Sequence, residues 1–237
     1  MKKSAVKKYY DDYITEQYKI GVNDRIFLLY EKLISLGLSN ESDVVELGCG
    51  IGAVTHLIRK TVSVGQIESV DISGESIEFA KGKIKNSNVQ FYEADITEYS
   101  PKIKIADFVT LFDVIEHIPI RLHEKLFLNV ANMLKEDGWL LVNIPSANSV
   151  EWDQIHAPEA LQIIDQPIPL DLMVKNCLNA GLEIIKFESY SIWVENDYNF
   201  FLIRKKKDFK NEPLQLNTIQ KAKRKAWRIK FKSLFKY

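Results

Sequence analysis

The sequence has no net formal charge, only two cysteines and no apolar run that approaches the length of a membrane span. A spanning helix needs about 20 apolar residues, and the charged N-terminal segment is not followed by an apolar one. Cys49 and Cys177 lack the spacing of a metal site or of a secreted disulfide framework. We therefore expect reduced thiols, no metal centre, no export and no membrane span.

Although the formal net charge is zero, the charges are unevenly distributed. Residues 213–237 hold eight Lys or Arg and no acid, which leaves 24 bases and 32 acids in residues 1–212. An apolar fraction of 46% over 237 residues is enough for a proper hydrophobic core. The composition predicts one large acidic domain followed by a basic tail.

Strand-type and helix-type segments alternate along the chain after an N-terminal helical region. Strands are predicted at residues 43–48, 66–71, 89–95, 106–114 and 139–145. Helices are predicted at residues 53–60, 74–84, 123–138 and 170–181. The helix at 123–138 is expected to end at Gly138. Its apolar stripe comprises Leu126, Val130, Met133 and Leu134.

This alternation predicts an α/β fold with a doubly wound, mostly parallel sheet and a ligand crevice at the carboxyl ends of its strands. Residues 182–191 and 198–206 are also strand-type, and the short segment IWVEND joins them, which indicates an antiparallel hairpin. We expect a seven-stranded, Rossmann-like sheet with a reversed terminal strand. Residues 146–170 are expected to be irregular.

The segment VVELGCGIGAVT places a carboxylate, Glu46, two residues before three alternating glycines. The glycines are Gly48, Gly50 and Gly52. Such turns commonly cradle phosphates, which a neighbouring carboxylate would repel, so the expected ligand is not a simple phosphate. Asp71 and Asp95 follow the next two strands, and the glycines and both acids fall at the predicted crevice.

These residues resemble the class I S-adenosylmethionine-dependent methyltransferases, over about residues 40–205, through ELGCGIG, VDIS and EADI at one-crossover spacings. The resemblance implies S-adenosylmethionine as cofactor, with Glu46 near its ammonium end, Asp71 on its ribose hydroxyls and Asp95 beside its adenine. A sulfonium cation also explains why a carboxylate is favourable here. The expected cofactor-binding residues are Tyr10, Glu46, Gly48, Cys49, Gly50, Gly52, Asp71, Ile72, Asp95, Ile96, Phe112 and Asp113.

Other interpretations of these residues stay open. The glycines could serve only a tight turn, Asp71 could cap the following helix, and Asp95 could form a turn. A nicotinamide-dependent oxidoreductase competes, because Gly48, Gly50 and Ala53 fit G-x-G-x-x-A and an acid follows about twenty residues later. Glu46 inside the first strand and the reversed terminal strand favour the methyltransferase.

The segment LFDVIEHIPIRLHEKL after the fourth strand bears on the acceptor. Enzymes that methylate nucleobase amines usually show Asn or Asp, two prolines and an aromatic here, and this sequence does not. Its form is similar to small-molecule methyltransferases of ubiquinone biosynthesis and sugar modification. No Asp-Asn pair supports a metal-assisted site. We expect methyl transfer to a hydroxyl of a sugar, or of a glycan or lipid-linked precursor, as in polysaccharide biosynthesis.

Methyl transfer to a hydroxyl needs alignment and a base. His117 lies a few residues beyond the fourth strand, and His156 lies in the segment after the fifth, so both are candidate catalytic bases. A structural role is the alternative for each. His56 and His123 are predicted to be packing or surface residues.

The two ends of the chain predict additional elements. Residues 1–40, which contain Tyr9, Tyr10, Tyr13 and Tyr18, are expected to form a helical lid on a methyltransferase domain at residues 41–209. Residues 210–237 are expected to form a basic amphipathic tail. One face of that helix carries Trp227, Phe231, Leu234 and Phe235.

Such a tail is typical of a helix that lies on anionic lipid. We therefore expect a cytoplasmic protein, peripheral at the inner face of the membrane. A solvated extension or an RNA-contacting arm is the alternative, although the acidic body argues against extensive nucleic-acid binding. An RNA methyltransferase and a noncatalytic adaptor with a methyltransferase fold remain alternative functions. The sequence leaves the oligomeric state open.

Overall fold

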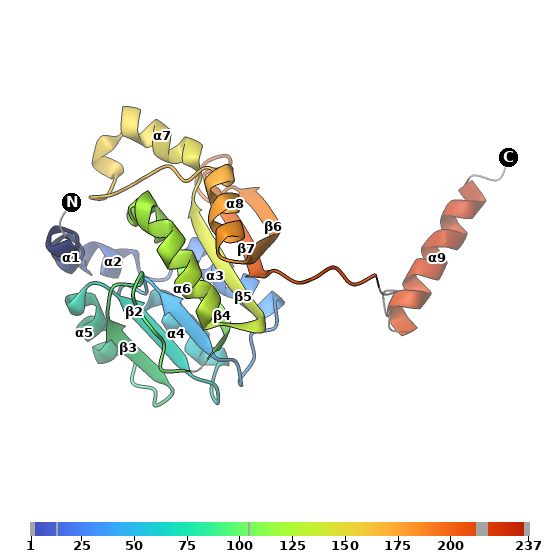
Figure 1. Cartoon of the computed structure of the whole chain (residues 1–237), viewed down its shortest axis with the longest axis horizontal. Helices are drawn as coiled ribbons and strands as arrows, with labels where there is room; N and C mark the ends of the chain where they lie inside the picture. Colours follow the sequence, from blue (N-terminus) through green and yellow to red (C-terminus); the bar gives the residue numbers. More distant parts are fainter. Residues whose placement is uncertain (1–2, 13, 104, 212–217, 235–237) are drawn as a thin grey trace. The chain divides into compact units, whose positions relative to one another are not determined.

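The chain is described here by a computed structural model that covers residues 3–12, 14–103, 105–211 and 218–234 (Figure 1). It divides into two compact units, Met1–Lys206 and Lys207–Tyr237. The first unit contains the sheet and the helices around it, including the N-terminal ones. The second contains helix α9 (Thr218–Leu234).

The first unit is built on one seven-stranded sheet with the order β3-β2-β1-β4-β5-β7-β6. The strands are β1 (Val44–Leu47), β2 (Ile67–Asp71), β3 (Val89–Glu93), β4 (Ala106–Phe112), β5 (Leu134–Pro145), β6 (Leu182–Tyr190) and β7 (Tyr198–Lys205). Strands β1 to β5 pair in parallel, and β7 pairs antiparallel with both β5 and β6. The predicted mostly parallel sheet with a reversed strand is confirmed. The reversed strand lies between β5 and β6, so β6 forms the sheet edge.

Helices cover both faces of this sheet (Figure 1). On one face lie α3 (Asp24–Ser35), α4 (Ala53–Thr61) and α5 (Gly74–Lys83), and on the other α6 (His123–Met133) and α8 (Leu170–Asn179). Successive strand residues alternate between the two cores, because Val44 packs with the first group and Val45 with the second. The remaining helices of this unit are α1 (Lys3–Asp12), α2 (Ile14–Ile20) and α7 (Ala147–His156), with short 3-10 turns at Ile115–His117, Ile120–Leu122 and Pro158–Ala160.

Two predictions about secondary structure are wrong, one helix boundary and one segment expected to be irregular. Helix α6 ends at Met133 and does not reach Gly138, because Leu134 already pairs with Ala106 of β4. The register then shifts, and the next pair joins Phe108 to Trp139. The segment expected to be irregular contains α7, whose first turn is capped by the Ser146 hydroxyl accepting a hydrogen bond from the Ser149 N–H at 3.2 Å.

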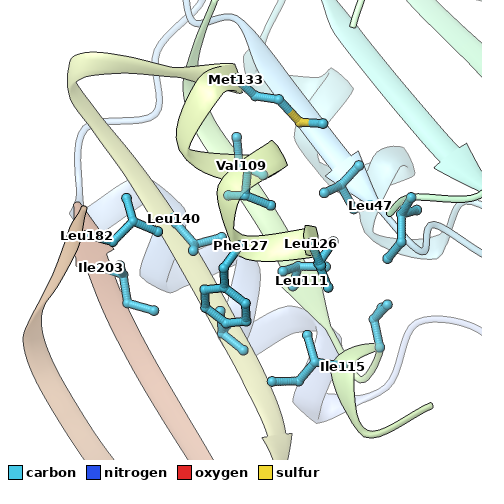
Figure 2. Close-up of a cluster of buried hydrophobic side chains, with 14 of the residues drawn as sticks. Leu47, Val109, Leu111, Ile115, Leu126, Phe127, Met133, Leu140, Leu182 and Ile203 are labelled. Atoms are coloured by element: carbon cyan, nitrogen blue, oxygen red, sulfur yellow. The ribbon is translucent and has the colours of Figure 1, made fainter. Parts of the chain in front are cut away.

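The core on the α6 side of the sheet is centred on Phe127. Its side chain is fully buried, as are those of Leu126, Val130 and Met133 on the same helix. Figure 2 shows Phe127 and Leu126 directed toward β4 and β5, near Leu111 and Leu140. The helical periodicity of the sequence therefore places Leu126, Val130 and Met133 correctly on α6, whereas Leu134, the last residue of the predicted stripe, begins β5.

We expect Phe127→Ala to lower the free energy of unfolding by about 3–5 kcal/mol, because it removes a large buried ring and leaves a cavity. Leu128→Ala is the matched control on the same helix, since the Leu128 side chain is 43% exposed, and it should cost less than about 1 kcal/mol. Urea unfolding followed by circular dichroism measures both values. Equal losses in the two variants would contradict this account of the core.

Candidate active site

A cavity of about 420 Å³ lies at the carboxyl ends of β1, β2 and β4. This volume is within the usual range for a small-molecule site. Eleven of the twelve residues predicted to bind the cofactor line it. They are Tyr10, Glu46, Gly48, Cys49, Gly50, Asp71, Ile72, Asp95, Ile96, Phe112 and Asp113. The sequence thus identified residues that the fold brings to one place.

Gly52 is the predicted residue that does not line the cavity. It is the residue before α4 and has a φ of 81°, in the left-handed region that favours glycine. A Cβ atom at this position would lie 3.2 Å from the Ile84 Cδ1 atom and 3.3 Å from the Ala80 Cβ atom. Gly52 therefore serves the turn and lets the chain at this point pack closely against the end of α5. Gly48 has a φ of 80°, and a Cβ atom there would overlap the Val114 side chain.

Glu46 is a buried carboxyl at the end of β1. Its Oε2 atom accepts hydrogen bonds from the hydroxyls of Thr55 and Ser69. Burial raises the pKa of Glu46 to about 7, and these two hydrogen bonds oppose the rise. A cation in the cavity would lower this pKa and favour the carboxylate, so the group suits a positively charged ligand.

Asp71 at the end of β2 fixes the glycine loop. Its Oδ2 atom accepts from the Gly50 N–H at 2.7 Å, and its Oδ1 atom accepts from the Ser73 N–H at 2.9 Å. Burial raises the pKa of Asp71. The cap of α5 is Ser73, whose hydroxyl accepts from the Ser76 N–H, so Asp71 is not that cap. Asp95 forms the turn that was the alternative to a place beside the adenine, because its Oδ1 atom accepts from the Thr97 N–H and hydroxyl, and it also lines the cavity.

The N-terminal helices supply one wall of this cavity, through Val6 and Tyr10 of α1 and Gln17 and Ile20 of α2. Helix α1 is held to the start of α5, since the Ser73 hydroxyl donates to Asp11 Oδ1 at 2.6 Å. Lys7 also pairs with Glu93 at 3.0 Å. The region predicted as a lid therefore borders the predicted cofactor site.

The four tyrosines named in the lid prediction, Tyr9, Tyr10, Tyr13 and Tyr18, differ in position. Tyr9 stacks edge-on against Tyr10, with ring centroids 5.3 Å apart. Tyr18 is 60% exposed and contacts Phe79, and Tyr13 lies outside the described residues. Of Tyr9, Tyr10 and Tyr18, Tyr10 alone lines the cavity.

A second cavity, of about 860 Å³, adjoins the first. Its walls come from the start of α7, residues 160–165, and the loop between β6 and β7. The residues that line both cavities are Arg25, Asp113, His117, Gln162 and Trp193. These shared residues mark where a group bound in one cavity would meet a group bound in the other.

His117 lies at this junction. Its Nδ1 atom is 2.8 Å from Asp165 Oδ1 and donates to the Ile164 carbonyl at 2.6 Å, while its Nε2 atom is 3.8 Å from Glu116 Oε1. Burial alone lowers the pKa of His117, but the carboxylates of Glu116 and Asp165 outweigh that effect and raise it to about 9. The tautomer of the neutral ring is thus fixed, with the proton on Nδ1.

The structure does not bring His156 to the site. It is exposed at the end of α7, its ring stacks on Trp152 with centroids 4.5 Å apart, and it lines neither cavity. His123 is fully buried and its Nε2 atom donates to the carbonyls of Ile115 and Ile118, which confirms the predicted packing role. His56 is partly buried and contacts Arg59.

Sequence reasoning missed several residues at the junction and in the second cavity, of which Arg25 is the clearest. Its Nη1 atom lies 3.1 Å from Asp113 Oδ2 and donates to the Tyr198 hydroxyl at 2.6 Å, across 173 residues of sequence. The others are Glu116, Gln162, Asp165, Trp193 and Tyr198. Glu116 could have been found as an acid beside His117, but the rest come from α3, from β7 and from distant loops, without a local motif.

Several buried polar atoms at the two cavities have no hydrogen-bond partner among the described residues. They are Tyr10 OH, Gln17 Oε1, Arg25 Nε, Asp113 Oδ1, Glu116 Oε2 and Gln162 Oε1. Buried polar atoms are normally satisfied, so this concentration indicates a polar ligand. Asp113 also has a φ of 55°, a strained value for a residue with a side chain. Together with the acids described above, the site fits a polar, cationic cofactor.

A family model described as "Methyltransferase domain" matches residues 22–186, well over half of the chain. Among curated proteins, the chain is 26% identical over 113 residues to the mitochondrial ubiquinone biosynthesis O-methyltransferase of Candida albicans, covering 46% of this chain and 34% of that protein. It is 30% identical over 115 residues to trans-aconitate 2-methyltransferase of Enterobacter sp. (strain 638), covering 48% and 44%. The chain thus spans less than half the length of these two relatives.

The matches to a third relative and to one solved structure cover a larger share of those proteins. Nodulation protein S of Azorhizobium caulinodans is 27% identical over 155 residues, which cover 63% of this chain and 71% of that protein. The fold is similar to that of magnesium protoporphyrin IX methyltransferase from Synechocystis PCC 6803 with bound SAH. That likeness has a TM-score of 0.68 at 14% identity and covers 86% of this chain and 99% of that one.

The family match favours the methyltransferase over the nicotinamide-dependent oxidoreductase. It agrees with the glycine loop, with the acids at the ends of β2 and β3, and with the sheet order that has a reversed strand between β5 and β6. The chain belongs to the methyltransferase-domain family, in the class I S-adenosylmethionine-dependent group.

Proposed function

We propose that this chain transfers a methyl group from S-adenosylmethionine to an oxygen of a small polar acceptor, a hydroxyl of a sugar or of a glycan or lipid-linked precursor. The main observation that supports this proposal is that the two adjoining cavities share His117, whose ring is held by Asp165. One cavity suits the cofactor, and the other provides a separate space for the acceptor.

In this proposal the cofactor, which supplies an activated methyl group on a sulfonium centre, occupies the cavity beside the glycine loop. The residues that would hold it are the eleven predicted ones that line this cavity. Asp71 would accept hydrogen bonds from the ribose hydroxyls, and Glu46 would offset the positive charge. Tyr10 would cover the cavity from α1.

His117 would act as the base that accepts the acceptor's hydroxyl proton. Asp165 and the Ile164 carbonyl engage Nδ1, so Nε2 is the atom that remains to take the proton. With a pKa raised to about 9 the ring is protonated at neutral pH, and a cation in the neighbouring cavity would lower that pKa. The bound cofactor would thus favour the basic form of His117. His156 is not part of this proposal, because it lies outside both cavities.

We also propose that α9 attaches the protein to anionic membrane surfaces. Five basic side chains are exposed along its described part, namely Lys221, Lys223, Arg224, Lys225 and Arg228. Trp227 is 64% exposed on the same helix, and the helix contains no acid. The side chains of Phe231, Leu234 and Phe235, predicted on the same face, lie outside what the structure describes. Within the described ranges, no helix is long and apolar enough to cross a membrane.

We expect Asp71→Ala to weaken the binding of S-adenosylmethionine and of its demethylated product by about thirtyfold to a hundredfold, because a carboxylate that accepts two hydroxyls makes charge-assisted hydrogen bonds. Asp171→Ala, at an exposed position on α8, is the control and should bind both normally. Calorimetry gives the affinities. Unchanged binding by the Asp71 variant would refute its assignment, and binding of NADH in place of the cofactor would refute the proposed function.

Replacing His117 by Ala should lower turnover by about a hundredfold or more while leaving cofactor affinity nearly unchanged. Wild-type turnover should rise with pH through the His117 pKa, at or below about 9, because only the neutral ring accepts a proton. Asp165→Asn should move this rise to lower pH, since it removes a carboxylate that raises the pKa. Transfer of labelled methyl groups to a small-molecule extract measures the rates.

His156→Ala is the matched histidine control and should retain normal turnover. If the His117 variant keeps normal turnover, or loses cofactor binding to the same extent as turnover, His117 is not the base. Label that appears in RNA and not in small molecules would favour the alternative of an RNA methyltransferase.

The full-length protein should sediment with anionic vesicles at low salt, bind neutral vesicles weakly, and be partly released at high salt. Replacing Lys223, Arg224 and Lys225 by Gln should weaken binding by about a hundredfold, at about 1 kcal/mol for each basic residue. The same replacement at Lys60, Lys85 and Lys175, which are exposed in the first unit, is the control. No sedimentation of the wild type, or equal losses in both variants, would rule out a membrane role for the helix.

A further inference from the structure

The second cavity has an unusual charge composition. Six carboxyl groups line it, against two basic side chains, Arg25 and His117, and none of its lining residues is a lysine. The carboxyls belong to Asp113, Glu116, Asp153, Asp165, Glu195 and Asp197. An anionic ligand entering this space would meet a surplus of negative charge.

Both basic side chains already have acidic partners. Arg25 pairs with Asp113 at 3.1 Å, and His117 pairs with Asp165 at 2.8 Å. Asp197 is engaged by the backbone of its own loop, because its carboxylate accepts from the N–H groups of Ile192 and Trp193. Each basic side chain that lines the cavity is therefore already paired with a carboxylate, and the Nε atom of Arg25 has no hydrogen-bond partner among the described residues.

Glu116 is different, because its side chain is buried without a matching donor. The side chain is 2% exposed, and its Oε2 atom has no hydrogen-bond partner among the described residues. The His117 Nε2 atom lies 3.8 Å from the Glu116 Oε1 atom, which is too long for a hydrogen bond. A donor supplied by a ligand would satisfy Oε2, and a positively charged donor would also match the surrounding acids.

The walls beside these acids are partly aromatic. Trp152, Trp193 and Tyr198 line the same cavity. Arg25 lies over the rings of Trp193 and Tyr198, at 5.6 and 5.5 Å from their centroids, so these two rings already pack against a cation. Trp152 is 56% exposed and offers a further ring at the cavity wall.

We propose that the acceptor carries a protonated amino group and that this group binds the Glu116 carboxyl in the second cavity, so that an amino sugar is favoured over a neutral or acidic sugar. The inference rests on the proposed function, because it takes the second cavity as the acceptor site. It deepens that function by defining the charge of the acceptor, and it leaves the methylated oxygen unchanged.

Three sugars with the same ring and different charge provide the probe, namely glucosamine, glucose and glucuronate. Binding to the full-length protein saturated with S-adenosylhomocysteine is measured by ligand-observed NMR titration. Glucosamine should bind at least about tenfold more tightly than glucose, because a charge-assisted hydrogen bond replaces a neutral contact, and glucuronate should bind more weakly than either.

Glu116→Gln should remove most of the preference for glucosamine over glucose while binding S-adenosylhomocysteine normally. Glu136→Gln is the control, because it makes the same chemical change at a side chain that is 81% exposed and lines neither cavity. Equal binding of glucosamine and glucose, tighter binding of glucuronate, no binding of glucosamine, or a preference unchanged in Glu116→Gln would each overturn the proposal. Because the readout is binding, selective binding without methyl transfer would refute the proposed function and leave the charge selection standing.

Discussion

The site depends on the parallel pairing that brings the carboxyl ends of β1, β2 and β4 to one level. Leu47 of β1 is in register with Val70 of β2 and with Leu111 of β4. The pairing extends into the glycine loop, because the N–H groups of Gly48 and Cys49 both donate to the Val70 carbonyl, at 2.7 and 3.0 Å. As a result the glycine loop and the loops after β2 and β4 open into the same cavity.

Buried carboxyls give this cavity region its chemical character. Burial raises the pKa of Glu46 and Asp71 at the first cavity, and of Glu116 at the second, because a low dielectric disfavours the charged form. Such groups gain most from a cation that restores their charge. One physical feature therefore supports both a sulfonium cofactor and an amine-bearing acceptor, and the well-packed cores on both faces of the sheet keep these groups in place.

The placement of β7 between β5 and β6 shapes the second cavity. It brings the loop between β6 and β7 beside the end of β5, where the Ser146 N–H donates to the Asp197 carbonyl at 2.8 Å. Trp193 and Asp197 thereby face the segment that follows β4. Residues from the reversed hairpin thus line the second cavity, whereas the first cavity is built mainly from the first half of the chain.

The sequence by itself determined the parallel sheet, the reversed strand, the glycine loop and the acids at the strand ends, because each is encoded in local spacing. Only the tertiary structure decided that Arg25, Asp165 and Trp193 line the same cavity as His117, since Arg25 lies in α3, and Asp165 and Trp193 lie in two loops whose approach depends on sheet order. It also decided that His156 lies outside both cavities, at the end of α7. The sequence did not predict this helix, because the segment lacks clear apolar periodicity. Local patterns fix elements and their ends, while convergence of side chains depends on how those elements pack.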